Sequence, residues 1–156
     1  MNPPYEGGCS CGAVRYRITG EPLAVYCCHC ADCQVSSGGA FSMSMLVMRD
    51  HLEVIGEQPA TYDHRIDGTD RTKRTRPCAV CGTRVWNEPA GAPAVVLKPG
   101  TLDDASWLRP VAHIWTRSAQ PWVPLPDGPL NYPLQPGDGM MAIITAYQAM
   151  RQAVQA

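Results

Sequence analysis

The chain has 156 residues, of which 45 % are hydrophobic and 17 % charged, a composition typical of one folded globular domain and not of a disordered chain. The formal net charge is −1 and no block of Lys and Arg is present, so the charge pattern does not indicate a nucleic-acid partner. No apolar run approaches the ~20 residues that a membrane span needs, and the first residues lack the pattern of a signal peptide. We therefore expect a cytoplasmic protein with no membrane partner.

Short alternating segments separated by Pro and Gly predict a mainly β architecture. The expected strands are residues 13–19, 23–28, 41–47, 52–55, 60–64, 71–76, 84–87, 94–98 and 112–116. One or two helical turns are expected over residues 31–37, ending at Gly38 and Gly39. Residues 71–76 (RTKRTR) alternate basic residues with Thr, which favours a strand with a solvated basic face.

The last third of the chain changes character twice. Residues 120–139 carry many prolines, which suit neither helix interiors nor central strands, so we expect an ordered irregular segment. Residues 140–154 then repeat apolar side chains at helical spacing, with Asp138 placed as an N-cap. The residues of the expected apolar face are Met140, Met141, Ile144, Tyr147, Met150 and Val154. We expect this C-terminal helix to pack on the same domain, and a homodimer contact is the alternative.

The eight cysteines form three groups: CSCG at 9–12, CCHCADC at 27–33 and CAVCG at 78–82. In a reducing compartment such spacings favour metal ligands over disulfides, and adjacent cysteines have poor disulfide geometry. A structural zinc site needs four ligands, and each glycine-ended pair supplies only two. We therefore expect the two pairs to meet and form one closed zinc site. Its ligands are Cys9, Cys11, Cys78 and Cys81.

The middle group differs because Cys28, Cys30 and Cys33 give three thiolates with no unused pair left elsewhere. Three protein ligands and one open position are typical of a reactive zinc. Cys27 is adjacent to Cys28, so its side chain is expected to point away. A reactive thiol cluster without metal is the alternative. His29 lies between two expected ligands, either as an acid or base near the metal or as a hydrogen-bonded loop residue.

Four segments together resemble the glutathione-dependent formaldehyde-activating enzyme family, which shares its domain with centromere protein V. They are GGCSCGAVRYRI (7–18), CHCADCQVSSGGAF (28–41), RPCAVCGTRVW (76–86) and AHIWTRSAQPWVPLPDG (112–128). The resemblance implies a β-tent fold of stacked antiparallel sheets around a zinc site. It also implies one structural zinc and a second, labile zinc at the two cysteine sets above. We expect a domain over residues 1–128 and a helical extension over 129–156.

The resemblance further implies carbon–sulfur lyase or synthase chemistry on a small thiol adduct, of the class formed by glutathione and formaldehyde. Cys28, Cys30 and Cys33 are then the expected catalytic residues, and the expected substrate contacts are Gln34, Gly38 and Gly39. Two other functions stay open at this point. One is a non-catalytic zinc module that binds a thiol carrier or a protein partner, and the other is a thiol-based redox or metal sensor.

Overall fold

The computed structural model describes residues 2–65, 72–127 and 130–155, which form two compact units. The first unit contains Met1–Pro22 and Met45–Leu108, and the second contains Leu23–Ser44 and Arg109–Ala156. Each unit therefore combines two separate stretches of the chain. The expected domain limit between residues 128 and 129 lies outside the described residues, and the division at that point remains a prediction.

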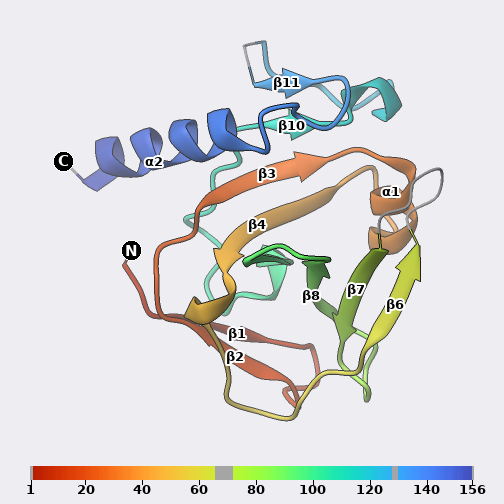
Figure 1. The fold of residues 1–156 in the computed structure, drawn as a ribbon, viewed down its shortest axis with the longest axis vertical. Helices are drawn as coiled ribbons and strands as arrows, with labels where there is room; N and C mark the ends of the chain where they lie inside the picture. Colours follow the sequence, from red (N-terminus) through yellow and green to blue (C-terminus); the bar gives the residue numbers. More distant parts are fainter. Residues whose placement is uncertain (1, 66–71, 128–129, 156) are drawn as a thin grey trace. The chain divides into compact units, whose positions relative to one another are not determined.

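The chain is mainly β, with two sheets and a C-terminal helix, as its sequence predicts (Figure 1). The first sheet lies in the first unit and is antiparallel. Its strands, in spatial order, are β1 (Tyr5–Gly8), β2 (Arg15–Ile18) and β5 (Leu52–Val54). Alternation along β2 leaves Tyr16 and Ile18 with no exposed surface, while the outward Arg17 pairs with Glu6.

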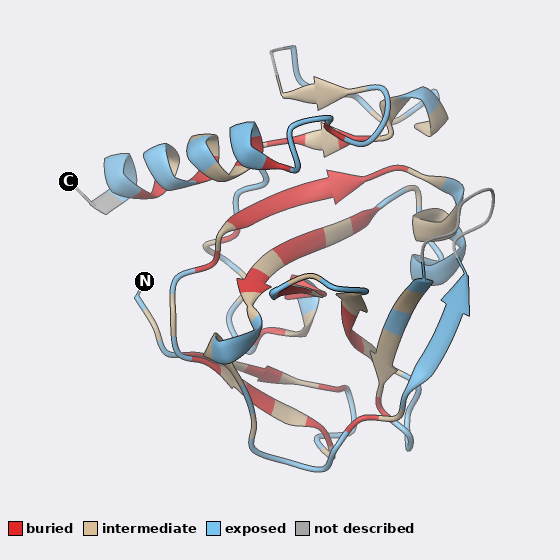
Figure 2. Ribbon diagram, in the orientation of Figure 1, coloured by how far each residue is buried: buried red, intermediate tan, exposed pale blue. Residues whose placement is uncertain are grey.

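The first unit also contains most of the second sheet, in which neighbouring strands are again antiparallel. In spatial order these strands are β4 (Ser42–Met48), β9 (Ala94–Leu97), β8 (Arg84–Pro89), β7 (Thr72–Pro77) and β6 (Tyr62–Arg65). Short 3₁₀ turns follow β4 and β9 at η1 (Arg49–His51) and η2 (Pro99–Thr101). β6 is exposed along its length, whereas Met45 and Val47 of β4 are fully buried (Figure 2).

The second unit is built around β3 (Ala24–Cys28), whose five residues are all buried. β10 (His113–Ile114) runs parallel to β3 on one side and to β11 (Asn131–Tyr132) on the other. The other elements of this unit are α1 (Ala31–Ser37), η3 (Thr116–Ser118) and α2 (Met141–Gln155). Burial of β3 on both faces explains why its sequence, AVYCC, shows no polar alternation.

The strands differ from the prediction in three places, of which one is β11, a strand of two residues within the segment expected to be irregular. β10 has only two residues because Trp115 adopts a left-handed conformation (φ 59°), which ends the expected strand over 112–116. β1 was not predicted, since its sequence YEGG carries no strand pattern. Its glycines have a packing role, because a Cβ atom on Gly7 would lie 2.4 Å from the Tyr16 hydroxyl. Residue 71 of the expected basic strand lies outside the described residues.

Helix α2 begins where Asp138 accepts hydrogen bonds from the backbone N–H groups of Met140 and Ala142, so the expected N-cap residue does cap it. The helix packs on β3 with a face that only partly matches the expected one, since Met140 and Tyr147 are buried as expected. Ile143 and Tyr147 are buried, whereas Met141 and Val154 are 58 % and 70 % exposed. The buried side chains therefore recur every four residues along the helix, starting at Ile143. No helix among the described residues is both long and apolar enough to cross a membrane.

The buried stripe of α2 gives a stability prediction. Ile143→Ala should lower the free energy of unfolding by ~2–4 kcal/mol, because it leaves a cavity against β3. Met141→Ala, on the exposed side of the same helix, should change it by less than about 0.5 kcal/mol. Urea unfolding followed by circular dichroism measures both. Equal losses from the two variants would contradict the assignment of the packed face.

Candidate metal centres

The first unit brings Cys9, Cys11, Cys78 and Cys81 together from two distant loops. All four sulfur atoms lie within 4.8 Å of one another. The Sγ atoms of Cys9 and Cys11 are 3.5 Å apart, and those of Cys11 and Cys78 are 3.7 Å apart. A zinc ion with four thiolates at about 2.3 Å requires sulfur atoms about 3.8 Å apart, so the spacing fits a tetrahedral ion.

The two loops that carry these cysteines have the same backbone design. In each loop the N–H of the first cysteine donates to the carbonyl five residues later, Val14 for Cys9 and Thr83 for Cys78. Gly12 and Gly82 then turn the chain back with φ angles of 81° and 73°. Such angles are costly for residues with a Cβ atom, which explains why each pair ends in glycine.

Hydrogen bonds to sulfur lower the pKa of Cys9 and Cys81, whereas Cys11 receives a backbone hydrogen bond from Ala13 but its contacts with the Cys9 and Cys81 thiols raise its pKa to about 12. The buried Cys9 sulfur accepts from the Val14 N–H at 3.2 Å, and Cys78 accepts from the Val80 N–H at 3.4 Å. The Thr83 hydroxyl, 3.2 Å from Cys81, lowers the pKa of that thiol to about 5. A thiolate at neutral pH is the ligand that zinc requires. The group therefore suits a closed structural site.

The second group lies in the second unit, where β3 ends and α1 begins. Cys28 is the last residue of β3, Cys30 is the N-cap of α1, and Cys33 lies in the first turn of that helix. Their three sulfur atoms also lie within 4.8 Å of one another. Cys28 is buried, whereas Cys30 and Cys33 are partly exposed, so solvent reaches one side of the group. Cys27 is not part of it, as expected for the alternate face of a strand.

Electrostatics of this second group are compatible with a bound cation. Hydrogen bonds with Cys30 and then Cys33 raise the pKa of Cys28 far above its ordinary value, because negative charges would share one partly buried space. A divalent ion would remove that penalty. Among the described residues, no fourth His, Cys, Asp or Glu completes the group. Its donor set therefore fits a metal with one ligand position left for another molecule.

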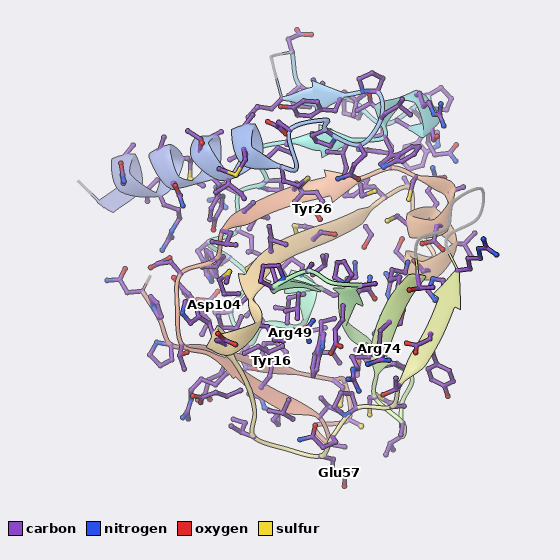
Figure 3. All side chains as sticks on the ribbon, in the orientation of Figure 1. Tyr16, Tyr26, Arg49, Glu57, Arg74 and Asp104 are labelled. Atoms are coloured by element: carbon purple, nitrogen blue, oxygen red, sulfur yellow. The ribbon has the colours of Figure 1, made fainter. Side chains whose placement is uncertain are left out.

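Two histidines meet beside this group, a contact that the sequence did not predict. His29 has no exposed surface, and its Nε2 lies 2.9 Å from Nδ1 of His113 on β10. Burial lowers the pKa of both imidazoles, so both are neutral near pH 7. Tyr26, two residues before Cys28 on β3, is also buried, and burial raises its pKa (Figure 3). The buried residues next to the three cysteines are therefore uncharged near pH 7.

The side chain of Gln34 forms hydrogen bonds within the chain. Its Nε2 donates to the carbonyl oxygens of His29 and Ser118, both at 2.8 Å, and its Oε1 accepts from Nε2 of Gln120 at 2.7 Å. This amide therefore connects the end of β3, helix α1 and the turn after η3. The contribution of Gln120 was not anticipated, because 86 residues separate it from Gln34.

The other expected substrate contacts, Gly38 and Gly39, are exposed at the end of α1. Gly38 has a φ of 65° and its N–H donates to the Gln34 carbonyl, so it ends the helix as predicted. The Gly39 N–H donates to the Ser37 hydroxyl at 3.3 Å. Both N–H groups thus have partners within the chain, and a role in substrate binding remains a prediction.

Known proteins share sequence or fold with this chain. The model of the family described as glutathione-dependent formaldehyde-activating enzyme matches residues 4–118. A Halomonas elongata protein, provisionally named as a glutathione-dependent formaldehyde-activating enzyme, is 28 % identical over 123 residues, which cover 76 % of this chain and 78 % of the relative. A Rhodobacter sphaeroides crystal structure has a similar fold, with a TM-score of 0.50 and 19 % identity, covering 67 % of this chain and 91 % of that one.

The family match carries more weight than either single relative, because it spans most of the chain. It includes all eight cysteines, both glycine-ended loops and the junction of β3 with α1. The chain therefore belongs to the glutathione-dependent formaldehyde-activating enzyme family.

Proposed function

We propose that this protein is a zinc-dependent carbon–sulfur lyase or synthase acting on an adduct of a small thiol with an aldehyde, of the glutathione and formaldehyde class. The observation that carries the proposal is the unequal pair of cysteine groups. Four sulfurs form a closed set, whereas Cys28, Cys30 and Cys33 form an incomplete and partly exposed one. The family name and that of the Halomonas elongata relative support glutathione and formaldehyde as reactants.

In this proposal Cys28, Cys30 and Cys33 hold a zinc ion and leave one position for the substrate sulfur. When bound, the ion lowers the pKa of a substrate thiol and polarises a carbonyl oxygen. In the forward direction a carbon–sulfur bond forms between thiol sulfur and aldehyde carbon, and the thiol proton passes through solvent to the carbonyl oxygen. The reverse reaction breaks that bond and returns the proton to sulfur.

The chain's contribution is to hold the three sulfurs in place. We propose that Gln34 does so by positioning, since its three hydrogen bonds fix both ends of the Cys28–Cys33 segment. The exposed Gly38 and Gly39 remain proposed contacts for a peptide-like thiol. We propose the cytoplasm as the compartment, because all eight cysteines are free. A homodimer through the exposed side of α2 stays a proposal of the same kind.

Two other functions compete with catalysis. A non-catalytic zinc module would bind a thiol carrier or a protein partner without turnover, and its binding would not need the second metal. A redox sensor would oxidise the second group reversibly under mild peroxide. The buried state of Cys28 and the raised pKa of its thiol disfavour Cys28 as the oxidised residue of a sensor, whereas Cys30 and Cys33 are partly exposed.

Metal analysis tests the two proposed zinc sites. Purified protein should contain between about one and two zinc ions per chain, with the second more easily removed by a chelator. Cys78→Ser should lose soluble folded protein, because binding at the four-sulfur site contributes to folding free energy. Cys30→Ser should keep the fold and lose only the labile ion. If the two variants behave alike, the division into structural and reactive sites is wrong.

Exchange spectroscopy tests the reaction. The protein should accelerate exchange between ¹³C-formaldehyde and S-hydroxymethylglutathione above the rate of the spontaneous reaction. Cys30→Ser should return the rate to that background, because the three-sulfur set is broken. Cys27→Ala is the matched control, since Cys27 neighbours the group without belonging to it, and it should keep the acceleration. A wild-type rate equal to the background would leave the binding module as the better function.

The positioning role of Gln34 gives a separate prediction. Gln34→Ala should release the labile ion to a chelator at least about tenfold faster than wild type, because three hydrogen bonds around the group are lost. The four-sulfur site and the cooperative thermal transition of the first unit should be unchanged. Gln148→Ala, an exposed position on α2, is the control. Release at the wild-type rate would show that Gln34 does not organise this group.

A further inference from the structure

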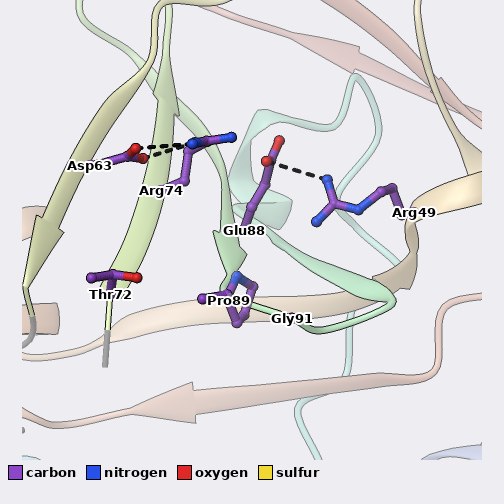
Figure 4. A pocket seen from close by; sticks show the side chains of 8 residues that line it. Arg49, Asp63, Thr72, Arg74, Glu88, Pro89 and Gly91 are labelled. Atoms are coloured by element: carbon purple, nitrogen blue, oxygen red, sulfur yellow. Dashed lines mark hydrogen bonds and ion pairs between the residues drawn. The ribbon is translucent and has the colours of Figure 1, made fainter. Parts of the chain in front are cut away.

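A polar cavity of about 360 Å³ lies in the first unit and is lined by no cysteine. It opens over the face of β6, β7 and β8, next to Arg49 of η1 and the turn at Ala90 and Gly91. Figure 4 shows the side chains that line it, with Glu88 between Arg74 and Arg49. Nothing in the proposed thiol chemistry uses this cavity, which raises the question of what it binds.

Charges across the floor of the cavity alternate along one row of the sheet. Asp63, Arg74 and Glu88 are directly opposite one another on β6, β7 and β8, so their side chains share a face. Arg74 donates from Nε and Nη2 to both oxygens of Asp63, at 2.8 and 3.0 Å. This fork holds Arg74 in place, and the Arg74 guanidinium in turn holds the pKa of Asp63 below its ordinary value.

Glu88 is the least exposed of these charged groups, with 11 % of its side chain accessible. It accepts from Nε of Arg76 at 2.9 Å and from the indole N–H of Trp86 at 3.0 Å. Burial alone would raise the pKa of Glu88, but these donors outweigh it and hold the pKa below its ordinary value. Glu88 is therefore a satisfied carboxylate before Arg49 contributes to it.

Arg49 is consequently the weakly held member of the network. Only its Nη1 approaches Glu88, at 3.3 Å, and 43 % of its side chain is exposed. Its Nε and Nη2, and Nη1 of Arg74, have no hydrogen-bond partner among residues 2–65, 72–127 and 130–155. Donor groups of two guanidinium ions are thus available at the cavity.

The net charge of this network also favours an anionic ligand. Arg49 and Arg74 line the cavity with the carboxylates of Asp63 and Glu88, and Arg76 pairs with Glu88 from outside the lining, so the whole network carries one uncompensated positive charge. A network built only for stability would gain little from the exposed Arg49, since such pairs contribute about 0–1 kcal/mol. A ligand with one negative charge and two acceptor oxygens in a plane would balance the charge and match the guanidinium geometry.

We infer that this cavity binds a small organic monoanion through its carboxylate group, held between Arg49 and Arg74. The apolar part of the ligand would lie against Pro89 and Ala90. A carboxylate is favoured over a phosphate because a dianion would exceed the single unbalanced charge and face the carboxylates of Asp63 and Glu88. The inference does not depend on either metal group, so it stands or fails separately from the proposed reaction.

Titrations on zinc-loaded protein by ¹H–¹⁵N NMR test the inference. The probes are acetate, propionate and benzoate, each compared with its neutral amide, and inorganic phosphate. The carboxylates should shift the Nε–H signals of Arg49 and Arg74 and the amides of β7, and the neutral amides should not. Affinity should fall as ionic strength rises, because the attraction between exposed charges is screened.

Variants assign the contacts. Arg49→Gln and Arg74→Gln should each weaken carboxylate binding at least about tenfold. Arg17→Gln is the control, because Arg17 is similarly exposed and paired with Glu6 on the other sheet, and it should bind like wild type. Should Arg74→Gln unfold, Arg74→Lys keeps the charge without the fork and should bind with intermediate affinity.

Four results would overturn the inference. They are no binding of any carboxylate, equal binding of the neutral amides, wild-type affinity in both glutamine variants, and tighter binding of phosphate than of the carboxylates. Absence of binding together with a loss of thermal stability in Arg49→Gln would instead assign Arg49 to an internal ion network.

Discussion

Crowded sulfur atoms are the constraint on which the rest of this structure depends. Seven cysteines lie in two groups whose sulfurs are within 4.8 Å of one another. Thiolates at that distance repel each other, so neither group can ionise fully without a cation. In the four-sulfur group a bound cation would also join loops separated by 67 residues, and its binding energy would then be part of the stability of the first unit.

The two groups differ in how their sulfur atoms are enclosed, because their backbones differ. Two glycine-ended loops enclose the first group, and N–H and hydroxyl donors already favour its thiolates. The second group begins on a strand and ends on a helix, so its three sulfurs lie on one side only. That geometry leaves one side of the group open, where the proposed function would place the substrate sulfur and where a bound ion would be accessible to a competing ligand. Gln34 connects the segment by hydrogen bonds to His29, Ser118 and Gln120, which is the basis of its proposed positioning role.

The arginine-lined cavity is also organised by charge, but the groups that would face its ligand are positive. Fixed carboxylates in a row of the sheet hold Arg74 and Arg76 in defined positions, and Arg49 remains loosely paired. Preorganised donors cost less entropy when a ligand arrives than donors that must first be ordered. The proposed anion site would therefore use charges that the folded chain holds in place before the ligand binds.

Local sequence determined what depends on neighbouring residues. The spacing and glycines of the cysteine loops, the turn at Gly38, the cap at Asp138 and most strands follow from such patterns. Only the tertiary structure decided what depends on residues far apart. It determined the strand at Tyr5–Gly8, the full buried face of α2 and the hydrogen bond between Gln34 and Gln120. The physical reason is that propensity acts over a few residues, whereas partners for buried or charged groups are supplied by the folded chain.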